Sequence, residues 1–414
     1  MSHRSAIVIG AGVVGTACAL NLLERDFDVT LIDRDTPGHG ASFGNASVIA
    51  ATEVVPISAP GVMKNVPKWL LNPEGPLFLS PAYFPRVLPW LIRFLRNSTH
   101  ARTEANASAL ASLCNRAVTD TREWLAGLGL DHDMTQNPSL RLYPSMAAVD
   151  ADAYKLGLRK HHGVDFEVID AGEIRRLEPS ITGSYGAGVL TTGAYYLRNP
   201  VRPVARSIER FQARGGTLKQ AEVTKLTHGE TAPGVRLATG DVLTADRVVL
   251  AAGIWSDTLA RSLGARFPLE SERGYHVQYT GLDVGLSRGL VDTVRGFAVS
   301  PVDDGLRVAG TVEFKGLKAP LDPRRTRVLE NHARTMFGDA LHDKPRTYWL
   351  GHRPSLPDNL PVIGPSKRQI GLFYAFGHGH LGLTLAATTG KLVADILSGT
   401  QPSLDPSPFA ADRF

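Results

Sequence analysis

The chain has few cysteines and little net charge. Only Cys18 and Cys114 occur among its 414 residues, so there is no CxxC pair, no zinc-type cluster and no disulfide framework. This excludes a small disulfide-stapled scaffold and fits a reducing compartment. The formal net charge is +5, a magnitude that does not by itself support nucleic-acid binding. We therefore expect no metal site and no nucleic-acid partner.

The sequence also has no internal repeat, low-complexity segment or linker between domains. With 43% hydrophobic and 21% charged residues, its composition is typical of a globular protein. The length corresponds to two or three domains with ample material for a buried core.

A strand, a glycine-rich turn, a helix and a second strand open the sequence. Residues 6–9 (AIVI) predict a short strand, residues 10–15 (GAGVVG) a turn into a helix over 16–24, and residues 29–32 the second strand. This is about the size of the strand-turn-helix-strand unit of a dinucleotide-binding fold. The glycines argue against reading the apolar start as a secretion signal.

Each glycine of this turn has a physical role in binding a dinucleotide. Gly10 permits the tight turn, Gly12 lets the backbone approach a pyrophosphate, and Gly15 allows the helix and strand to pack closely. Asp33, at the end of the second strand, is placed to accept hydrogen bonds from a ribose diol. A glycine-rich turn without a ligand is the alternative. The motif does not separate NAD from FAD, although Asp33 argues against a 2′-phosphate.

A second glycine-rich junction lies near the other end of the chain. Residues 370–376 (IGLFYAF) predict a strand, residues 377–384 (GHGHLGLT) follow it, and residues 385–397 have a helical pattern. Backbone N–H groups that converge at such a junction, backed by a helix amino terminus, suit the negative charge near N1 and C2=O of a reduced flavin. Packing alone would explain one such junction, but its pairing with the first motif favours a flavin.

Several motifs in a fixed order resemble those of the D-amino-acid oxidase-like flavoenzymes. Within that superfamily the chain is most similar to bacterial D-amino-acid dehydrogenases and their relatives that oxidise D-proline or hydroxy-D-proline, and the similarity extends over essentially the full length. The motifs are Gly10 to Gly15, Asp33, residues 40–47 (GASFGNAS), residues 251–255 (AAGIW), residues 351–354 (GHRP) and residues 377–384.

The resemblance implies an α/β fold of the two-domain α+β kind. A Rossmann-type FAD-binding domain would comprise residues 1–55, 196–266 and 346–414. It would be interleaved with an antiparallel-sheet substrate domain comprising residues 56–195 and 267–345. The resemblance further implies a noncovalent FAD and oxidation of an amine carbon beside a carboxylate.

The residues that the motifs and the resemblance together assign to FAD fall in six groups along the chain. They are Gly10, Gly12, Val13, Val14, Gly15, Asp33, Arg34, Ser42, Asn45, Ala46, Val223, Ala252, Gly253, Trp255, Gly377, His378, Gly379, His380, Leu381, Gly382, Leu383 and Thr384. Val223 would meet the adenine ring through its backbone. For Trp255, an ordinary core position is an equal alternative. Neither cysteine is near the carboxyl-terminal flavin motif, so we do not expect thioether attachment of the flavin.

The middle of the chain agrees with this architecture. We expect a helix from 199 to 214 and strands over 217–226 and 245–250 in the FAD-binding domain. Strands over 275–280, 296–301 and 306–313 are expected in the antiparallel sheet that would cover the flavin.

Two residues are the candidates for binding and turning over the substrate. An amino-acid carboxylate in a dry pocket needs a cation, and arginine can hold both of its oxygens. The resemblance gives this role to Arg353, with a structural arginine as the alternative. Tyr275 would complete the carboxylate site through its hydroxyl, although a sheet tyrosine often only packs. We assign neither His378 nor His380 a proton-transfer role, since the Cα hydride moves to flavin N5 without a strong base on carbon.

A basic stretch lies between the segments of the FAD-binding domain. Residues 54–103 carry Lys64, Lys68, Arg86, Arg93, Arg96 and Arg102 against the single acid Glu74. Within it, residues 81–97 place Leu88, Leu91, Ile92 and Leu95 at helical spacing. One interpretation is a helix over the active-site mouth with its arginines in water. The other is peripheral contact with an anionic membrane surface.

The predicted function is FAD-dependent oxidation of a D-amino acid, including D-proline or cis-4-hydroxy-D-proline, to an imine or 2-oxo acid. The electron acceptor is either O2 or a quinone of the respiratory chain. We expect a cytoplasmic protein, either free or peripheral on the inner face of the cytoplasmic membrane. The alternatives are a flavin subunit of a hetero-oligomeric amine dehydrogenase, an NAD-dependent dehydrogenase, and a glycine or sarcosine oxidase.

Overall fold

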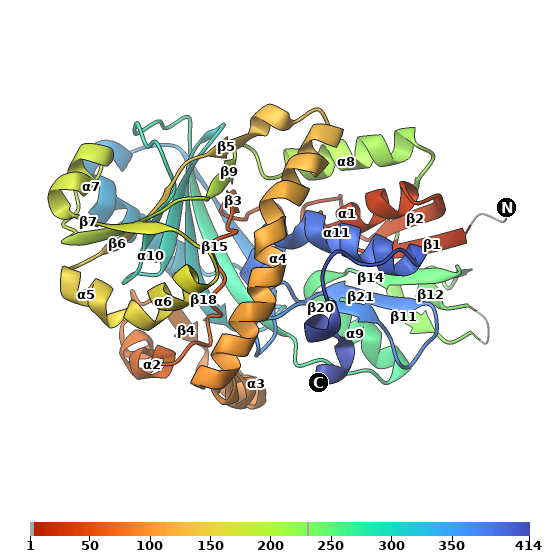
Figure 1. Cartoon of the computed structure of the whole chain (residues 1–414). Coiled ribbons are helices and arrows are strands. Elements are labelled where there is room, and N and C mark those ends of the chain that lie inside the picture. Colours follow the sequence, from red (N-terminus) through yellow and green to blue (C-terminus); the bar gives the residue numbers. More distant parts are fainter. Residues whose placement is uncertain (1–3, 230–231) are drawn as a thin grey trace.

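Two large β-sheets organise the molecule, one on the right and one on the left of Figure 1. The computed structural model describes residues 4–229 and 232–414. Strands of each sheet come from several separate stretches of the chain. The predicted fold, a Rossmann-type domain interleaved with a sheet-based second domain, is therefore confirmed.

A six-stranded sheet carries the amino-terminal motif. Its strands are parallel except for the last pair, in the order β10, β2, β1, β14, β21, β20. Their bounds are β1 (Arg4–Ile9), β2 (Phe27–Asp33), β10 (Thr217–Gln220), β14 (Arg247–Leu250), β20 (Val362–Pro365) and β21 (Leu372–Phe376). The central strands are apolar and buried on both faces, as a covered parallel sheet requires.

Helices cover one face of this sheet and a small sheet covers the other. The helices are α1 (Val13–Leu23), α4 (His100–Gly127), α8 (Arg202–Ala213) and α11 (Gly382–Ser398). The opposite cover consists of β11 (Val223–Thr227), β12 (Gly234–Leu237), β13 (Val242–Thr244) and α9 (Ser256–Ala260). Successive side chains of β1 point to opposite faces of the sheet. Val8 therefore packs against the helices, whereas Ile7 and Ile9 pack against the small sheet. Residues Gly379–Ser398 are long and apolar enough to cross a membrane, but 78% of their most apolar window is buried inside the protein.

A nine-stranded, mostly antiparallel sheet forms the second unit. Its main path runs β19, β15, β18, β17, β16, β6, β8, β7, and β4 pairs with β18. The bounds are β4 (Leu77–Leu79), β6 (Ser139–Tyr143), β7 (Phe166–Asp170), β8 (Ala187–Thr191), β15 (Glu270–Thr280), β16 (Leu290–Asp292), β17 (Phe297–Val302), β18 (Gly305–Phe314) and β19 (Arg346–Ser355). One face packs on α10 (Pro323–Phe337), and α5 (Met146–Ala151), α6 (Ala153–His161) and α7 (Ala171–Leu177) pack near its far edge.

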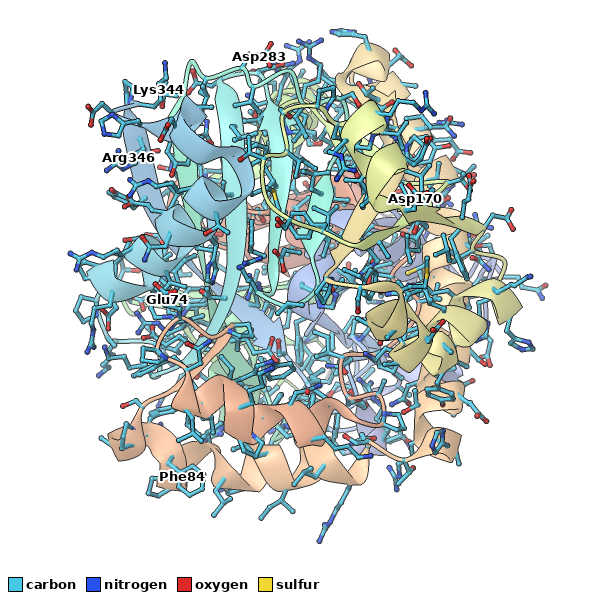
Figure 2. The ribbon with its side chains drawn as sticks, turned by 90° about the vertical axis from the view of Figure 1, so that its left-hand side faces the viewer. Glu74, Phe84, Asp170, Asp283, Lys344 and Arg346 are labelled. Atoms are coloured by element: carbon cyan, nitrogen blue, oxygen red, sulfur yellow. The ribbon has the colours of Figure 1, made fainter. Side chains whose placement is uncertain are left out.

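Two smaller groups of elements complete the structure. A three-stranded sheet joins β3 (Val48–Ile49), β9 (Tyr195–Leu197) and β5 (Met134–Gln136). Helices α2 (Val62–Leu71) and α3 (Phe84–Arg96) lie side by side along the lower edge of the molecule in Figure 2.

Three expectations about elements need correction. The single strand predicted over 217–226 is two strands, β10 and β11, which belong to different sheets. Strand β19 pairs with β15, so residues 346–355 belong to the nine-stranded sheet and not to the predicted FAD-binding domain.

Helix α4 lies within the predicted substrate domain, but it packs on α11. Its Asp120 accepts hydrogen bonds from Thr388 (2.8 Å) and Lys391 (3.0 Å) of α11. In Figure 1 this long helix crosses in front of both units. The other predicted boundaries stay predictions.

Candidate active site

The glycine-rich turn after β1 is shaped by contacts that leave no room for side chains. Gly10 has φ +102°, and a β-carbon there would lie 2.5 Å from the carbonyl oxygen of Ala251. A β-carbon on Gly15 would overlap the carbonyl oxygen of Gly10, which is the close helix–strand packing that the motif predicts. At Gly12 the nearest atom to such a carbon is Ser42 Oγ at 3.3 Å, so the backbone is accessible there.

Two side chains brace this turn. Asp33 accepts a hydrogen bond from the backbone N–H of Ala11 at 2.6 Å, and its other oxygen accepts from the N–H of Asp35 at 3.0 Å. Ser42 Oγ accepts from the N–H of Val13 at 2.9 Å, in the first turn of α1. The predicted contact of Asp33 with a ribose stays a prediction, but its carboxylate stands at the turn where that contact is expected.

The carboxyl-terminal junction also presents backbone to the interior. Gly377 and Gly379 have φ of +83° and +54°, which lets the chain turn sharply between β21 and α11. His378 is buried, and its Nε2 lies 3.0 Å from the hydroxyl of Thr389. Burial lowers the pKa of His378 to about 3. The ring is therefore neutral and fixed in the core, and the backbone of this residue is what the site can use.

A single cavity of about 860 Å³ lies between the two large sheets, a volume that suits a cofactor-sized ligand. Most of the residues predicted to bind FAD line it, although they come from separate parts of the sequence. Those that do are Gly10, Gly12, Val13, Val14, Asp33, Arg34, Ser42, Asn45, Ala46, Val223, Ala252, Gly253, Trp255, Gly377, His378, Gly379, His380, Gly382 and Leu383. Trp255, for which core packing was the alternative, is half-buried, with the Arg34 guanidinium 4.1 Å from its ring centre.

Three of the residues predicted to bind FAD do not line the cavity but pack next to its walls. Gly15 packs against Gly10, and Leu381 is buried in the core. The Thr384 hydroxyl accepts a hydrogen bond from the N–H of Ala50 at 2.9 Å. These residues support the walls and do not line the interior.

The cavity fits the FAD that the sequence predicts. Backbone is exposed where phosphates need N–H groups, at Gly12 and the start of α1. A second helix, α11, directs its amino terminus into the same space from the Gly377–Gly379 turn. Both cysteines are buried in the core, and neither lines the cavity. This placement agrees with the prediction that FAD is bound noncovalently.

Arg353 projects into the cavity from β19. Its Nη1 donates to the carbonyl oxygen of Thr311 at 3.0 Å, and Glu272 lies opposite it on β15. Burial lowers the pKa of Arg353 while Glu272 raises it, and an arginine remains protonated near neutral pH. A cation within an enclosed cavity suits a carboxylate.

The structure does not bring Tyr275 to the same place. Residues alternate between faces along β15, and Gly274 lies against Arg353 whereas the next side chain points to α10. The Tyr275 hydroxyl donates to Glu313 at 2.5 Å and accepts from Arg273 at 3.3 Å. Burial and Glu313 raise the pKa of Tyr275 to about 12. This residue borders the cavity, but its hydroxyl belongs to a buried ion-pair network, so the predicted carboxylate contact is wrong.

Sequence reasoning missed a group of charged and polar residues in the cavity. Glu53, from the loop after β3, pairs with Arg141 of β6 and with Arg159 of α6, whose Nη2 lies 3.1 Å from Glu53 Oε2. Tyr196 of β9 lies nearby, and its hydroxyl has no hydrogen-bond partner among the described residues. No local motif marks these positions, because they come from four separate segments.

The side chain of His380 lies near both Arg353 and Arg141. It projects into the cavity, where enclosure by the protein lowers its pKa to about 4, and Glu53 raises it while Arg353 and Arg141 lower it. His380 is therefore neutral near physiological pH. That it takes no part in proton transfer stays a prediction.

Comparisons with known proteins give a consistent result. The model of the DAO family, FAD dependent oxidoreductase, matches residues 5–396. The chain is 38% identical over 420 residues to a D-amino-acid oxidase of Bradyrhizobium diazoefficiens, with 99% of both chains covered. It is 30% identical to a D-amino acid dehydrogenase of the same organism, covering 99% of this chain and 98% of the relative.

Solved structures share the fold at lower identity. Glycine oxidase from Geobacillus kaustophilus aligns with a TM-score of 0.77 at 20% identity, covering 99% of each chain. L-proline dehydrogenase from P. horikoshii aligns with a TM-score of 0.75 at 16% identity, covering 100% of this chain and 98% of the other. At these identities the likeness shows the fold alone.

Proposed function

Because the chain belongs to the DAO family of FAD-dependent oxidoreductases, we propose that it oxidises the C–N bond of a D-amino acid. The observation that carries the proposal is the position of Arg353. This cation enters the cavity from the nine-stranded sheet, opposite the cofactor cradle formed by the Gly10–Gly15 and Gly377–Gly379 turns. The relatives named D-amino-acid oxidase and D-amino acid dehydrogenase support the choice of the D series.

The residues of the cavity support this chemistry by binding and orienting. Arg353 holds the substrate carboxylate, and its own position is fixed by Thr311 and by the bare backbone of Gly274. When bound, FAD would supply the acceptor for the Cα hydride and its two electrons. The substrate ammonium would first lose a proton to solvent, and departure of the hydride would leave the imino acid as a protonated imine. Water then converts this product to a 2-oxo acid and ammonia.

Cyclic secondary amines fall under the same proposal. D-proline and cis-4-hydroxy-D-proline present the same carboxylate and Cα hydrogen, and they would leave as cyclic imines. His378 and His380 are neutral near physiological pH, so neither adds a charge that would repel a cationic substrate before its amine is deprotonated.

Anaerobic mixing of the purified flavoprotein with single amino acids tests the proposal. Loss of the flavin colour is expected with D-amino acids and not with their L enantiomers. The panel includes D-proline, cis-4-hydroxy-D-proline, glycine and sarcosine. Readmission of oxygen then shows the acceptor, because an oxidase regains its colour quickly and a dehydrogenase that uses a quinone does not. A flavin that no amino acid reduces would refute the proposal.

We further propose that the cytoplasmic protein contacts the inner face of the membrane through α3 and passes electrons to a quinone there. Val87, Trp90 and Phe94 bury one face of this helix against Phe314. A second stripe of α3 is apolar yet exposed, and Figure 2 shows Phe84 on the outer edge of the molecule. Its exposed fractions are 43% for Phe84, 39% for Leu88, 42% for Ile92 and 41% for Leu95.

Charge at this edge supports a lipid partner. The exposed residues Arg86, Arg93 and Arg96 lie on one side of the apolar stripe, away from the buried face of α3, and Leu71 at the end of α2 is 83% exposed. An apolar stripe next to a row of arginines is typical of helices that lie on anionic lipid. Flotation with vesicles tests this: binding to phosphatidylglycerol vesicles that weakens in high salt, and that Ile92→Asp abolishes, is expected. Protein that never floats would contradict it.

A further inference from the structure

We propose that the end of the cavity next to β6 binds a second acidic group of the substrate, so that the enzyme prefers D-amino acids with a carboxylate side chain. This inference rests on the proposed function and specifies its substrate class. The residues that form the subsite are Arg141, Ser139, Tyr196 and Glu53, all of which line the cavity.

Arg141 projects from the same face of the nine-stranded sheet as Arg353. Residues directly opposite each other on paired strands point to the same face, and so do residues two apart along one strand. The paired residues that connect Trp349 on β19 with Arg141 on β6 are His276, Ala309, Ala298 and Val291. Trp349 and Arg353 are four residues apart on β19, so both arginines enter the cavity from one wall.

The wall between the two arginines has small side chains. Ala309, Ala298 and Val291 occupy the three central strands at this level, and all three line the cavity. They leave space for an aliphatic chain that extends from Cα toward β6. A substrate anchored at Arg353 by its α-carboxylate would therefore direct its side chain toward Arg141.

Hydrogen-bond donors outnumber acceptors at the β6 end. Both oxygens of Glu53 are already used, one by Arg141 and the other by Arg159 at 3.1 Å. Arg141 donates only one of its N–H groups to a described residue, although a guanidinium carries several. Tyr196 is 6% exposed, and its hydroxyl lies beside Ser139 and the Gly289 backbone without a well-formed hydrogen bond to a described residue. Buried polar groups of this kind are normally paired, which points to an acceptor that the substrate brings.

The local charge favours an anion. Burial raises the pKa of Glu53, but the attraction of Arg141 and Arg159 outweighs burial and lowers this pKa to about 2. Glu53 is therefore ionised. With Arg159, which pairs with Glu53 but does not line the cavity, the cluster carries a net charge of one positive unit. A basic side chain would meet the Arg141 guanidinium, whereas a carboxylate can accept from Arg141 and Tyr196.

The experiment compares isosteric substrates that differ only in side-chain charge. Holoenzyme is assayed with D-glutamate against D-glutamine and with D-aspartate against D-asparagine, by anaerobic flavin bleaching and by steady-state kcat/KM. We expect the acidic member of at least one pair to be favoured about tenfold or more. Calorimetry with glutarate and butyrate, which do not react, gives a readout independent of turnover, and tighter binding of glutarate is expected.

Three variants separate the possible roles of this cluster. Arg141→Gln is expected to abolish the preference for the acidic substrate. Glu53→Gln is expected to increase it, because the competing carboxylate is removed while both arginines stay. Tyr196→Phe, which keeps the ring, is expected to reduce the preference several-fold and keeps the test decisive if Arg141→Gln does not fold. Arg175→Gln on α7 removes an exposed arginine outside the cavity and serves as the control.

The outcomes distinguish this inference from the proposed function. If no D-amino acid bleaches the flavin, the proposed function fails and the inference fails with it. If D-amino acids bleach the flavin but D-glutamine and D-asparagine react as well as their acidic counterparts, only the inference is refuted. A preference for D-lysine that Glu53→Gln removes would assign the opposite charge to the subsite and would also refute it.

Discussion

The guanidinium of Arg353 lies against the Cα of Gly274, on the strand next to its own. A β-carbon at position 274 would lie 2.7 Å from Arg353 Nη1, well inside van der Waals contact. Glycine at this position therefore permits the arginine to lie flat on the sheet and to direct its donors into the cavity. The position of Arg353 therefore depends on the absence of a β-carbon at Gly274.

Gly274→Ala is expected to displace Arg353 while the cofactor cradle stays intact. The KM for the amino acid should rise about tenfold, which corresponds to about 1.4 kcal/mol of lost binding. Steady-state kinetics and the flavin content of the purified variant measure the two effects. Gly157→Ala on α6, where a β-carbon meets nothing within 4 Å, is the control. An unchanged KM in Gly274→Ala would mean that Arg353 does not need this contact.

Arg353→Leu is expected to retain FAD and to lose substrate affinity. Truncating one partner of an enclosed charged pair costs about 2–5 kcal/mol, so KM should rise roughly 30-fold or more. Titration of the flavin spectrum with an unreactive carboxylate measures binding without turnover. Arg353→Lys keeps the charge but loses the planar fork, and an intermediate affinity is expected. Steady-state constants equal to those of the wild type would remove Arg353 from the site.

Tyr275→Phe is expected to affect stability more than activity. The hydroxyl bonds to Glu313 and Arg273, and its loss should lower the free energy of unfolding by about 1 kcal/mol. KM should stay within about twofold of the wild type, since the side chain does not reach the substrate. Denaturant unfolding and steady-state kinetics together test this. A large rise in KM with unchanged stability would restore the carboxylate role.

Strand pairing explains why Arg353 faces the cavity whereas the Tyr275 side chain points toward α10. The Gly10–Gly15 and Gly377–Gly379 turns are local features, so the sequence alone predicts their shape. Which face of β15 meets the cavity depends on its pairing with β18 and β19, and a shift of one residue reverses every side chain. The Tyr275 side chain therefore points to the face of the sheet opposite that of Arg353.

The polar end of the cavity could not be predicted because no local pattern encodes it. Glu53, Arg141 and Tyr196 meet only after three segments have packed together. Helix α3 shows a related limit. Its sequence has two apolar stripes, and periodicity alone does not indicate that Trp90 and Phe94 are buried while Leu88 and Ile92 are exposed.

Acidification is expected to destabilise the protein through His378. Its pKa is lowered from 6.5 to about 3 in the folded state, so the unfolded chain binds the proton more readily as pH falls below about 6.5. This one group lowers the free energy of unfolding by about 2 kcal/mol at pH 5 relative to pH 7.5, since each pKa unit is worth about 1.36 kcal/mol.

Thermal unfolding at pH 7.5, 6 and 5 checks the contribution of His378. The loss of Tm on acidification should be smaller in His378→Gln, which keeps an amide near Thr389 but cannot take up a proton in this range. His342→Gln, which changes an exposed histidine, is the matched control for the substitution itself. Parallel curves for wild type and His378→Gln would contradict this explanation.

Anaerobic reduction of the bound flavin by paired D- and L-amino acids is the sharpest test of the proposed function. We expect that the purified protein carries FAD, that at least one D-amino acid bleaches it, that the L enantiomer does not, and that Arg353→Leu slows bleaching without loss of FAD. Reduction by the L enantiomer alone, or rates in Arg353→Leu equal to those of the wild type, would contradict it.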